Sequence, residues 1–537
     1  MGKKIYNFIP KLFFIVFLIF VTFISLGVIL LSFRGNVDPD HNIRFQNIFE
    51  SKVTEAGSPF EVSISSGRYA LVESIVKNRS FIFSEAIAKF ASPDVIYTKL
   101  GFSSVFTPGV SIVAVPFYLL GSHFGYPQIG TYLLNPFVGL INVFLIAYLA
   151  YLVTKNKYLA LSSGLIFLFG TNAFSYLFTL TQHHLSISLI LIGIIISYSE
   201  NIVIVNIITG ILLGIGVLID FPNIFLLSPI FIYNLSKNFY IFKATERLNT
   251  ISIKKSVILI ILAASPFLLF FGIYNQITTG SPTKLAQFVG ITDYFSKNTP
   301  SPYKNNQKLP VNIEESKSVV NPIVDIPFKT RKMLNGFIIL FLSDERSWLH
   351  YAPILLFGIY GFIIYLKNNS SSLLSKIGLS IITVNIITYT MFGDVWGGWA
   401  FGPRYLLPSA AILSIFITYP FTLQIKKFWK IFLFLIMLFL IFASININTI
   451  ASVTTSALPP KQEAMNLLTP IPYDLELNYS LLDQNKSSSL LYNVYFKNYF
   501  SATEYTDFIT IIIFFEITSI LFLAEISKIK LFKNQSK

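Results

Sequence analysis

Long apolar runs separated by short polar segments dominate the pattern of this chain. The first runs from Leu12 to Ser32 and a later one from Ile129 to Val153, and each matches the length of about 20 residues that a membrane-crossing helix needs. The run Pro108–Gly121 is apolar but too short to cross comfortably. The pattern predicts an all-α bundle of about twelve transmembrane helices, with Pro108–Gly121 as a re-entrant or juxtamembrane segment.

Lysine and arginine in the short loops give an orientation, because such residues stay on the cytoplasmic side. If Pro108–Gly121 does not cross, every strongly basic short loop falls on one side together with both termini. If it crosses, most of these loops move to the other side. We therefore predict a multi-pass protein of the cell membrane with both termini cytoplasmic. The basic segments are Lys3–Lys11, Lys155–Lys157, Ser236–Lys255, Lys367–Lys376, Lys426–Lys430 and the tail from Lys528 onward.

Composition supports the membrane class and excludes several chemistries. Hydrophobic residues make up 53% of the 537 positions and charged residues only 12%, against about a quarter charged in soluble domains. The net charge of +14 does not predict a nucleic-acid partner, because no basic stripe alternates with aromatics on a soluble domain. Cysteine is absent, which excludes disulfides, thiolate metal ligands and a cysteine nucleophile.

Three longer segments are predicted on the outer side, at about 33–107, 275–347 and 450–505. None is large or hydrophobic enough for an independent globular domain, and no solenoid-type repeat is visible. In the first segment, Ser65–Val76 has apolar residues at helical spacing. We expect an amphipathic helix that lies on the membrane surface, with Arg68 facing lipid phosphate.

Polar residues gather at the predicted outer ends of the spans, where ionisable groups are costly. Each has an ordinary structural interpretation: a His or Trp anchors at the interface, Asp220 caps or breaks a helix, and Asp344–Arg346 is a solvated loop. Their convergence favours an enzyme at one interface over a transporter, which places such groups near mid-membrane. The residues are His183, His184, Asp220, Tyr274, Asn275, Asp344, Glu345, Arg346, His350, Asp394, Trp396, Trp399 and Arg404.

Several short motifs occur in a characteristic order. They are Arg68-Tyr69-Ala70, Thr107-Pro108-Gly109 followed by Val115-Pro116-Phe117, Tyr274-Asn275 with Gly280-Ser281-Pro282, and Trp396-Gly397-Gly398 with Gly402-Pro403-Arg404-Tyr405-Leu406. In order and outward placement they resemble the GT-C superfamily of membrane glycosyltransferases, near the protein O-mannosyltransferases and lipid A aminoarabinose transferases (glycosyltransferase family 39-like). The resemblance extends from Arg68 to about Pro408.

The resemblance implies a GT-C-like transmembrane domain over residues 1–450, including the first extracytoplasmic loop 33–107. We expect a small extracytoplasmic segment at 451–505, and a last transmembrane helix with a basic cytoplasmic tail at 506–537. The implied activity is transfer of a hexosyl-type sugar from a polyprenyl (dolichyl) phosphate carrier to an acceptor on the extracytoplasmic face. The implied partners are membrane lipid, the carrier, and a protein or glycolipid acceptor, with no nucleic acid. Some relatives need a divalent cation and others do not, so the cofactor stays open.

In the superfamily, an acidic residue of the first loop acts as base toward the acceptor hydroxyl. Relatives commonly carry Asp or Asp-Glu shortly before the Arg-Tyr, where this chain has Ser65-Ser66. Serine cannot serve as a carboxylate base. The candidates for the catalytic base are Asp94, favoured by its Pro-Asp context, and Glu61, and the third possibility is that neither is the base.

The remaining candidates are predicted to bind substrate. Arg404 is our choice for the donor phosphate, with a snorkelling interfacial arginine as the alternative. His183 and His184 are candidates for phosphate or a divalent metal, although adjacent residues do not share a helix face. The other substrate-binding candidates are Arg68, Tyr69, Asp220, Asp394 and Trp396.

Three other functions compete with a single-sugar transferase. A catalytically degenerate GT-C scaffold is supported by Ser65-Ser66, and a transporter or flippase would need mid-span charges and two similar halves. An oligosaccharyltransferase usually has a large C-terminal globular domain with a Trp-Trp-Asp motif, and this sequence has neither.

Overall fold

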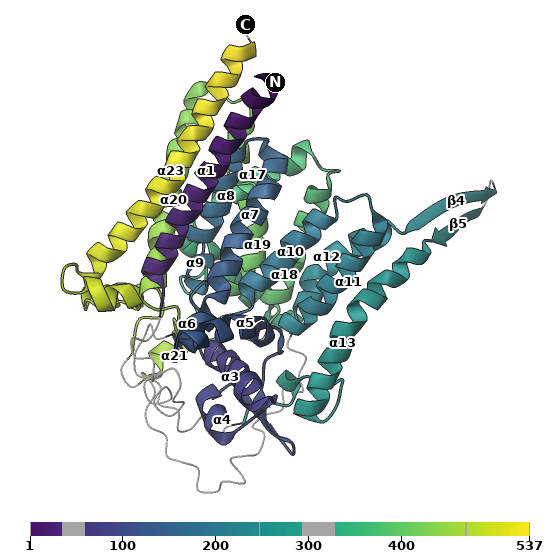
Figure 1. Cartoon of the computed structure of the whole chain (residues 1–537), viewed down its shortest axis with the longest axis vertical. Helices are drawn as coiled ribbons and strands as arrows, with labels where there is room; N and C mark the ends of the chain where they lie inside the picture. Colours follow the sequence, from purple (N-terminus) through teal and green to yellow (C-terminus); the bar gives the residue numbers. More distant parts are fainter. Residues whose placement is uncertain (1, 35–58, 246–247, 293–327, 468–469, 536–537) are drawn as a thin grey trace.

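The computed structural model describes residues 2–34, 59–245, 248–292, 328–467 and 470–535 (Figure 1). Eight stretches of helix are long and apolar enough to cross a membrane, and five further apolar helices are shorter. The eight lie in α1 (Gly2–Ser32), α6–α7 (Pro127–Tyr132, Leu134–Thr154), α11 (Ile202–Ile219), η2–α13 (Lys255–Val257, Ile258–Thr279), α18 (Leu373–Thr390), η6–α19–η7 (Arg404–Leu406, Leu407–Ser414, Tyr419–Thr422), α20 (Lys427–Val453) and α23 (Ala502–Gln535). The all-α transmembrane class is confirmed. The number of about twelve spans stays a prediction.

The shorter apolar helices are α5 (Gly109–His123), α8 (Lys157–Phe169), α10 (His183–Ile196), α12 (Asn223–Ser236) and α17 (Leu355–Asn368). Helices α1, α20 and α23 lie side by side, and both termini are at one end of the bundle (Figure 1). Helices α3 (Ser63–Asn78) and α4 (Glu85–Ala91) lie at the opposite end. We call these two ends the terminal face and the α3 face.

Helix α5 does not run from one face to the other. The Lys157 Nζ atom, at the start of α8, lies 3.8 Å from the ring centroid of Phe14, where the apolar span of α1 begins, so the turn before α8 is on the side of the terminal face. The Tyr132 hydroxyl, at the end of α6, donates a 2.7 Å hydrogen bond to the Pro59 carbonyl at the α3 face. Helix α7 therefore carries the chain from the α3 face to the terminal face, and the preceding α5–α6 hairpin stays at the α3 face. This agrees with the prediction of a re-entrant or juxtamembrane segment.

The helix predicted around Arg68 is present as α3, but its environment differs from the prediction. Its residues from Ser65 to Ser74 are all buried. A helix buried on every side packs inside protein and cannot float on a lipid surface, so the amphipathic surface helix is wrong. Next to α3 and α4 lies an antiparallel sheet in the order β1-β3-β2. Its strands, β1 (Ile82–Phe83), β2 (Val95–Thr98) and β3 (Gly101–Ser104), are too short to show a two-residue period in sequence.

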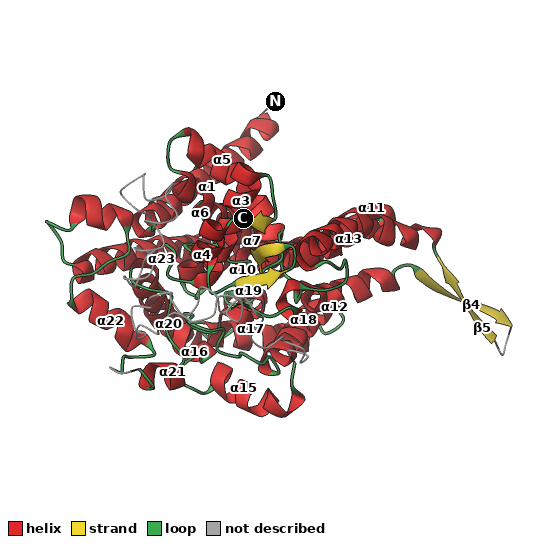
Figure 2. Cartoon of the chain, turned by 90° about the horizontal axis from the view of Figure 1, so that it is seen from below, coloured by secondary structure: helices red, strands yellow, loops and turns green. Residues whose placement is uncertain are grey.

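A second antiparallel pair, β4 (Phe239–Thr245) with β5 (Leu248–Ile253), projects away from the bundle as a hairpin (Figures 1 and 2). It falls within the predicted cytoplasmic loop Ser236–Lys255. The other elements named below are α9 (Ala173–Tyr176), η5 (Thr330–Lys332) and α22 (Leu475–Asp483). The remaining short elements are η3 (Ala286–Phe288), α15 (Met333–Phe341), α16 (Trp348–Tyr351), α21 (Lys461–Met465) and the π-helix η8 (Tyr492–Phe496).

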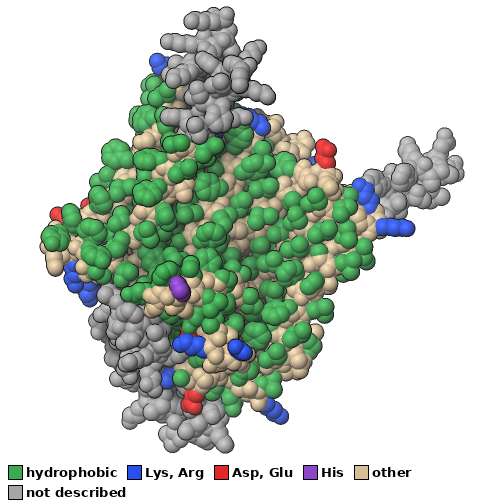
Figure 3. All heavy atoms as spheres, in the orientation of Figure 1, with side chains coloured by type: hydrophobic (Ala, Val, Ile, Leu, Met, Phe, Trp, Pro, Cys, Tyr) green, Lys and Arg blue, Asp and Glu red, His purple; other side chains and the backbone are tan. Residues whose placement is uncertain are grey.

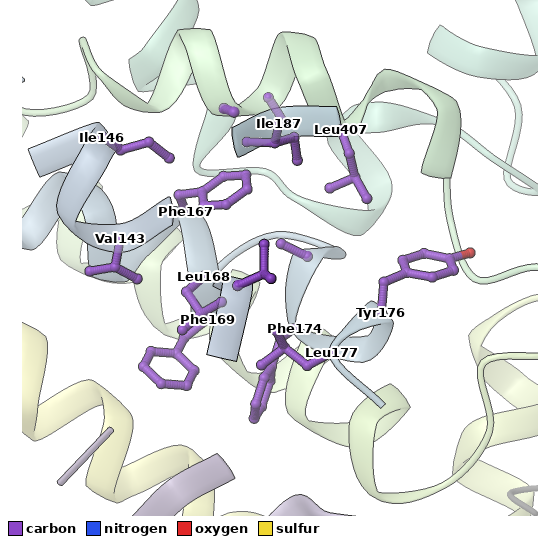
Figure 4. Packing of buried hydrophobic residues seen from close by; sticks show 14 of the residues in the cluster. Val143, Ile146, Phe167, Leu168, Phe169, Phe174, Tyr176, Leu177, Ile187 and Leu407 are labelled. Carbon is purple, nitrogen blue, oxygen red and sulfur yellow. The ribbon is translucent and has the colours of Figure 1, made fainter. Parts of the chain in front are cut away.

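The bundle is apolar both inside and out, as a lipid-embedded protein requires. Hydrophobic side chains cover the middle of the visible surface, and the charged ones lie toward its ends and margins (Figure 3). Inside, side chains of α7, α8, α9, α10 and α19 interlock in one cluster (Figure 4). Tyr176 lies at the edge of this cluster, and its hydroxyl donates a 3.0 Å hydrogen bond to the Phe401 carbonyl of the α3 face. The core thereby supports the polar loops described below.

A buried ion pair lies next to the end of α1, and its two residues also contact the end of α20 and the residues that follow it. Arg34 is 1% exposed and lies 2.5 Å from the Glu61 carboxylate. Glu61 also accepts hydrogen bonds from the Thr455 hydroxyl and from the backbone and hydroxyl of Ser456. Arg34 donates in addition to the Ala451 carbonyl at 2.9 Å. The proposed domain boundary at 450/451 thus falls inside α20, close to this junction.

We predict that α5 and the α10–α11 turn lie on opposite sides of the membrane. Because the natural chain has no cysteine, single substitutions His123→Cys and Glu200→Cys, both at exposed positions, can be labelled with a membrane-impermeant maleimide. Only one of the two is expected to react in intact cells, and the other should react after permeabilisation. Labelling of both from the same side would contradict the path of α5.

A second prediction concerns the Arg34–Glu61 pair. Arg34→Leu leaves the Glu61 charge buried without its cation, and removing one partner of such a pair costs about 3–5 kcal/mol. We expect a clear fall in the melting temperature of the detergent-purified protein. Lys461→Ala is the control, because Lys461 and Asp344 form an exposed pair at 4.0 Å, and it should leave the melting temperature nearly unchanged. Equal effects of the two substitutions would show that burial of the pair does not matter.

Candidate functional site

Four segments that are far apart in sequence meet at the α3 face. They are α3 at Arg68, the residues that lead into α10, the end of α11 at Asp220, and the start of η6 at Arg404. Arg68 lies close enough to Asp220, Arg404 and Asp94 for their charges to act on its pKa. We call this group, with Gln182 and His183, the arginine site.

Arg68 is 2% exposed and is held by both its backbone and its side chain. Its Nη1 donates to the Leu180 carbonyl at 3.2 Å, and its guanidinium carbon lies 5.1 Å from the Phe106 ring centroid. The Arg68 carbonyl accepts a 2.9 Å hydrogen bond from the Ser111 hydroxyl of α5. Burial lowers the pKa of Arg68 to about 10, an effect that Asp220 opposes and Arg404 reinforces. Arg68 therefore stays cationic at neutral pH.

Arg404 is 6% exposed and follows a glycine-rich loop. Gly397, Gly398 and Gly402 have φ values of 72°, 63° and 60°, in the left-handed region that glycine adopts without strain. A Cβ on Gly397 would lie 2.7 Å from Arg404 Nε, so the loop needs glycine there to make room for the guanidinium. The Arg404 guanidinium lies 5.1 Å from the Tyr405 ring centroid. The Tyr405 ring stacks on Tyr389 at 4.5 Å and so fixes this wall of the site.

Asp220 ends α11 in an extended conformation, which turns the chain toward α12. Its carboxylate is partly exposed and accepts a 2.9 Å hydrogen bond from the Gln182 side chain. Burial raises the pKa of Asp220, and the nearby Arg68 opposes that rise. Asp220 thus acts here as part of a charged cluster and not only as the helix cap that the sequence allowed.

The two neighbouring histidines have different environments. His183 is 5% exposed and close enough to Arg68 and Arg404 for their charges to act on it. His184 points into the bundle, and its Nε2 lies 3.0 Å from the Ala173 carbonyl. The expectation that they do not share a helix face agrees with this arrangement. Only His183 belongs to the arginine site.

Asp94 approaches the site from the sheet next to α3. A Cβ on Gly67 would lie 3.5 Å from the Asp94 Cβ, so glycine beside Arg68 allows the two segments to pack closely. The Asp94 charge acts on Arg68. The structure therefore brings together Arg68, Asp94, His183, Asp220 and Arg404.

Two buried cations side by side are costly unless they are compensated. Within the residues that the structure describes, neither Arg68 nor Arg404 forms an ion pair with a carboxylate. In the same part of the chain, Nε of both arginines, Nη1 of Arg404 and Nε2 of His183 are buried with no hydrogen-bond partner. Guanidinium groups bind phosphate through paired, charge-assisted hydrogen bonds. The arrangement suits an anion of the phosphate type.

The chain is similar to solved structures at low sequence identity and with TM-scores below 0.5. Its solved structural neighbours include ArnT from Cupriavidus metallidurans bound to undecaprenyl phosphate, with 10% identity, a TM-score of 0.44, and coverage of 94% of this chain and 77% of ArnT. The apo form of the same ArnT has 11% identity and a TM-score of 0.45, with coverage of 93% of this chain and 77% of ArnT. A third structure is the archaeal oligosaccharyltransferase AglB from Archaeoglobus fulgidus in complex with an inhibitory peptide and a dolichol-phosphate. It has 11% identity and a TM-score of 0.45, with coverage of 90% of this chain and 60% of AglB.

No protein-family model and no curated protein matches the sequence. Structural likeness at such low identity assigns neither a substrate nor a mechanism to this chain. The chemistry of the site has to come from its own residues.

The remaining predicted site residues lie outside the arginine site. Glu61 is occupied by Arg34, Thr455 and Ser456, as described above. Tyr69 packs against Phe60 and Phe90 in an aromatic cluster. Their catalytic and substrate-binding roles stay predictions.

Asp394 and Trp396 belong to the loop that carries Arg404. Asp394 is exposed, accepts a 3.1 Å hydrogen bond from the Gly397 backbone, and lies close enough to Arg404 for its charge to act on that arginine at the edge of the site. The Trp396 indole donates to Glu345 at 2.8 Å. Arg346, which was interpreted as part of a solvated loop, is 0% exposed and donates to the Trp396, Gly398 and Leu458 carbonyls. That interpretation is wrong for Arg346, whose charge holds the glycine-rich loop in place.

Sequence reasoning missed Gln182 and the structural role of Ser65. Gln182 adjoins the two histidines that drew attention, but an amide gives no titratable signal in a sequence. The Ser65 hydroxyl accepts a 3.0 Å hydrogen bond from the Leu180 backbone, so it ties α3 to the segment before α10. No group of three or more His, Asp or Glu residues suited to a metal ion occurs among the described residues.

Gly397→Ala should weaken binding of a phosphate-type anion by about tenfold or more, because loss of a charge-assisted hydrogen bond costs about 1.5–3 kcal/mol. The new methyl group would displace Arg404. The measurement is the thermal stabilisation of the purified protein by inorganic phosphate. Gly398→Ala is the matched control: it has the same unfavourable φ, but its Cβ would meet nothing closer than Asp394 Oδ2 at 4.0 Å. If both variants lose affinity equally, backbone strain and not Arg404 is responsible.

Proposed function

We propose that this chain is a membrane glycosyltransferase that moves one sugar from a polyprenyl-phosphate carrier to an acceptor at the α3 face. The observation that carries the proposal is the pair of buried arginines, Arg68 and Arg404, whose donors face no carboxylate partner within the described residues. The α3 face is then extracytoplasmic and both termini are cytoplasmic, as the basic loops predict.

At the sugar donor, the reaction mainly requires stabilisation of the negative charge that develops on the phosphate. When the bond between the sugar and the phosphate breaks, negative charge develops on the phosphate, and fixed cations stabilise it. Arg68 and Arg404 would hold that phosphate, with the His183 ring beside them. Since Arg404 begins a membrane-spanning stretch, the apolar polyprenyl tail can remain in the bilayer while its head reaches the site.

The acceptor would come from the water side of the same face and would be a protein hydroxyl or a glycolipid. Asp220 is partly exposed and lies near Arg68, so we expect such an acceptor to meet its carboxylate beside the bound phosphate. The serines that replace the acidic pair of relatives are not available for this role. Ser65 bonds to Leu180, and the Ser66 hydroxyl bonds to the Ser63 carbonyl.

The position of the charges also bears on the transporter alternative. The charged residues of the arginine site lie at one face, and Asp220 and Arg404 lie at the ends of the membrane-spanning stretches that carry them. An acid also lies in the middle of a span: Glu516 of α23, 6% exposed, accepts a 2.9 Å hydrogen bond from Ser25 of α1. It belongs to the contact between two outer helices and not to the arginine site, so it does not support a transport path through the bundle centre.

The test is transfer from radiolabelled polyprenyl-phosphate sugars into a membrane lipid and protein extract by the purified protein. Arg68→Leu and Arg404→Leu are each expected to lower the transfer rate by about 100-fold or more, because each removes charge stabilisation of the leaving phosphate. Arg331→Leu is the control, since Arg331 in η5 is an exposed arginine near the same face. No transfer from any donor by a wild-type protein that still binds undecaprenyl phosphate would favour the degenerate scaffold.

A further inference from the structure

The proposed transfer needs a carboxylate base, and the structure separates the acids near the α3 face into two kinds. Glu61 uses its oxygens to satisfy Arg34 and the hydroxyl and amide groups of Thr455 and Ser456. Both Glu61 oxygens are engaged in this way, so taking a proton from an acceptor hydroxyl would require these contacts to break. Glu61 is therefore unsuited to the role of base.

Asp220 is in the opposite situation. Its carboxylate accepts a 2.9 Å hydrogen bond at Oδ2 from the Gln182 side chain and another from the Phe221 backbone, which orient it, and the residue is partly exposed. It forms no ion pair with Arg68 or Arg404 in the described part of the chain, although both are near enough to act on it electrostatically. A base that is oriented, accessible and adjacent to the cations that hold the leaving group meets the geometric requirement for proton abstraction.

The backbone around Asp220 is held as firmly as the side chain. The Thr107 hydroxyl donates to the Ile219 carbonyl at 2.9 Å, and Gly109 packs directly against the Leu218 carbonyl, where a Cβ would collide. On the other side, the Asn223 side chain donates to the Gly216 carbonyl at 3.0 Å. The Thr107-Pro108-Gly109 motif thus fixes the position of Asp220 relative to Arg68. Such support is typical of a positioned catalytic group.

We propose that Asp220 is the general base of the transfer reaction and that Gln182 positions it. The inference rests on the function proposed above. It assigns to the end of α11 the role that relatives give to the acidic pair before Arg-Tyr, which is Ser65-Ser66 in this chain.

The step balances without any further reagent. Asp220 takes the proton of the acceptor hydroxyl, and the acceptor oxygen forms a bond to the anomeric carbon of the sugar. The bond from that carbon to the phosphate oxygen breaks, and its electron pair stays on the lipid phosphate. The proton then passes from Asp220 to the released phosphate or to water.

A pH dependence follows from the surroundings of Asp220. The charged and titratable groups that face it are Arg68, Arg404, Tyr389 and Tyr405. Burial raises its pKa above the ordinary value of 3.8, and the arginines oppose that rise. Transfer should therefore fall as the pH is lowered through this raised pKa, because only the deprotonated form accepts a proton.

The experiment compares Asp220→Asn, Asp220→Glu and Gln182→Leu in the full-length protein, with radiolabelled polyprenyl-phosphate sugars and the same extract as acceptor. Asp220→Asn should reduce kcat by about 100-fold or more, while binding of undecaprenyl phosphate, measured by thermal shift, stays within a few-fold. Retained binding also shows that the variant folds. Asp220→Glu should recover part of the rate and move the acid limb of the pH profile. Gln182→Leu should move that limb as well, an effect that a merely structural role would not produce.

Two further variants make the outcome decisive. Asp483→Asn, at an exposed position at the end of α22, is the matched control and should leave the rate unchanged. Asp94→Asn is the competitor: if it abolishes transfer while Asp220→Asn remains active, Asp94 is the base and our inference is overturned. Wild-type protein that binds undecaprenyl phosphate but transfers nothing would overturn the proposed function itself, and the role of Asp220 with it.

Discussion

The organisation of the α3 face depends on holding two arginines side by side away from water. Each buried ion carries a desolvation penalty of several kcal/mol, and two like charges add repulsion. Asp220 and Asp94 offset part of that repulsion through space. Rigid packing has to offset the rest of the repulsion. Arg68 is held by hydrogen bonds to Leu180 and from Ser111. Arg404 packs against a loop in which Gly397 leaves room for its guanidinium. An anion placed between them would relieve both the repulsion and the unmet donors.

The short helix α5 provides the physical link between these parts. Its first turn contacts the end of α11 at Leu218, and its Ser111 holds the Arg68 carbonyl. At its other end, Gly121 and Gly130 let α5 fold back on α6, since a Cβ on Gly121 would lie 2.7 Å from the Gly130 Cα. A helix that crossed the membrane could not make contacts at the same face with both of its ends. Its juxtamembrane position is therefore a condition for the site as well as for the orientation of the chain.

The sequence predicts the parts of this structure that follow from hydrophobic periodicity and from the free-energy cost of burying charge. Long apolar runs reveal α1, α7 and α13, and the cost in free energy of ionisable groups at membrane depth points to His183, Asp220 and Arg404, whereas Arg68 was expected on a lipid surface. The sequence does not reveal which residues, distant along the chain, contact one another in the folded protein. Arg346 was interpreted as a solvated loop residue because its charge is visible in the sequence and its carbonyl partners are not. Glu61 likewise became a candidate base because nothing in the sequence indicates that Arg34 lies beside it.

The replacement of the acidic pair by Ser65-Ser66 can now be weighed against the alternative of an inactive scaffold. In this chain Ser65 has a defined structural task, since it bonds to the same Leu180 residue that anchors Arg68. A carboxylate at position 65 could not accept that bond without adding a buried negative charge beside Arg68, where it would compete with a bound phosphate. A scaffold that had lost its chemistry would have no reason to maintain two uncompensated arginines, because apolar residues of similar volume would be at least as stable. Under the proposed function, the serines belong to a site whose base lies elsewhere, and their presence alone does not indicate lost activity.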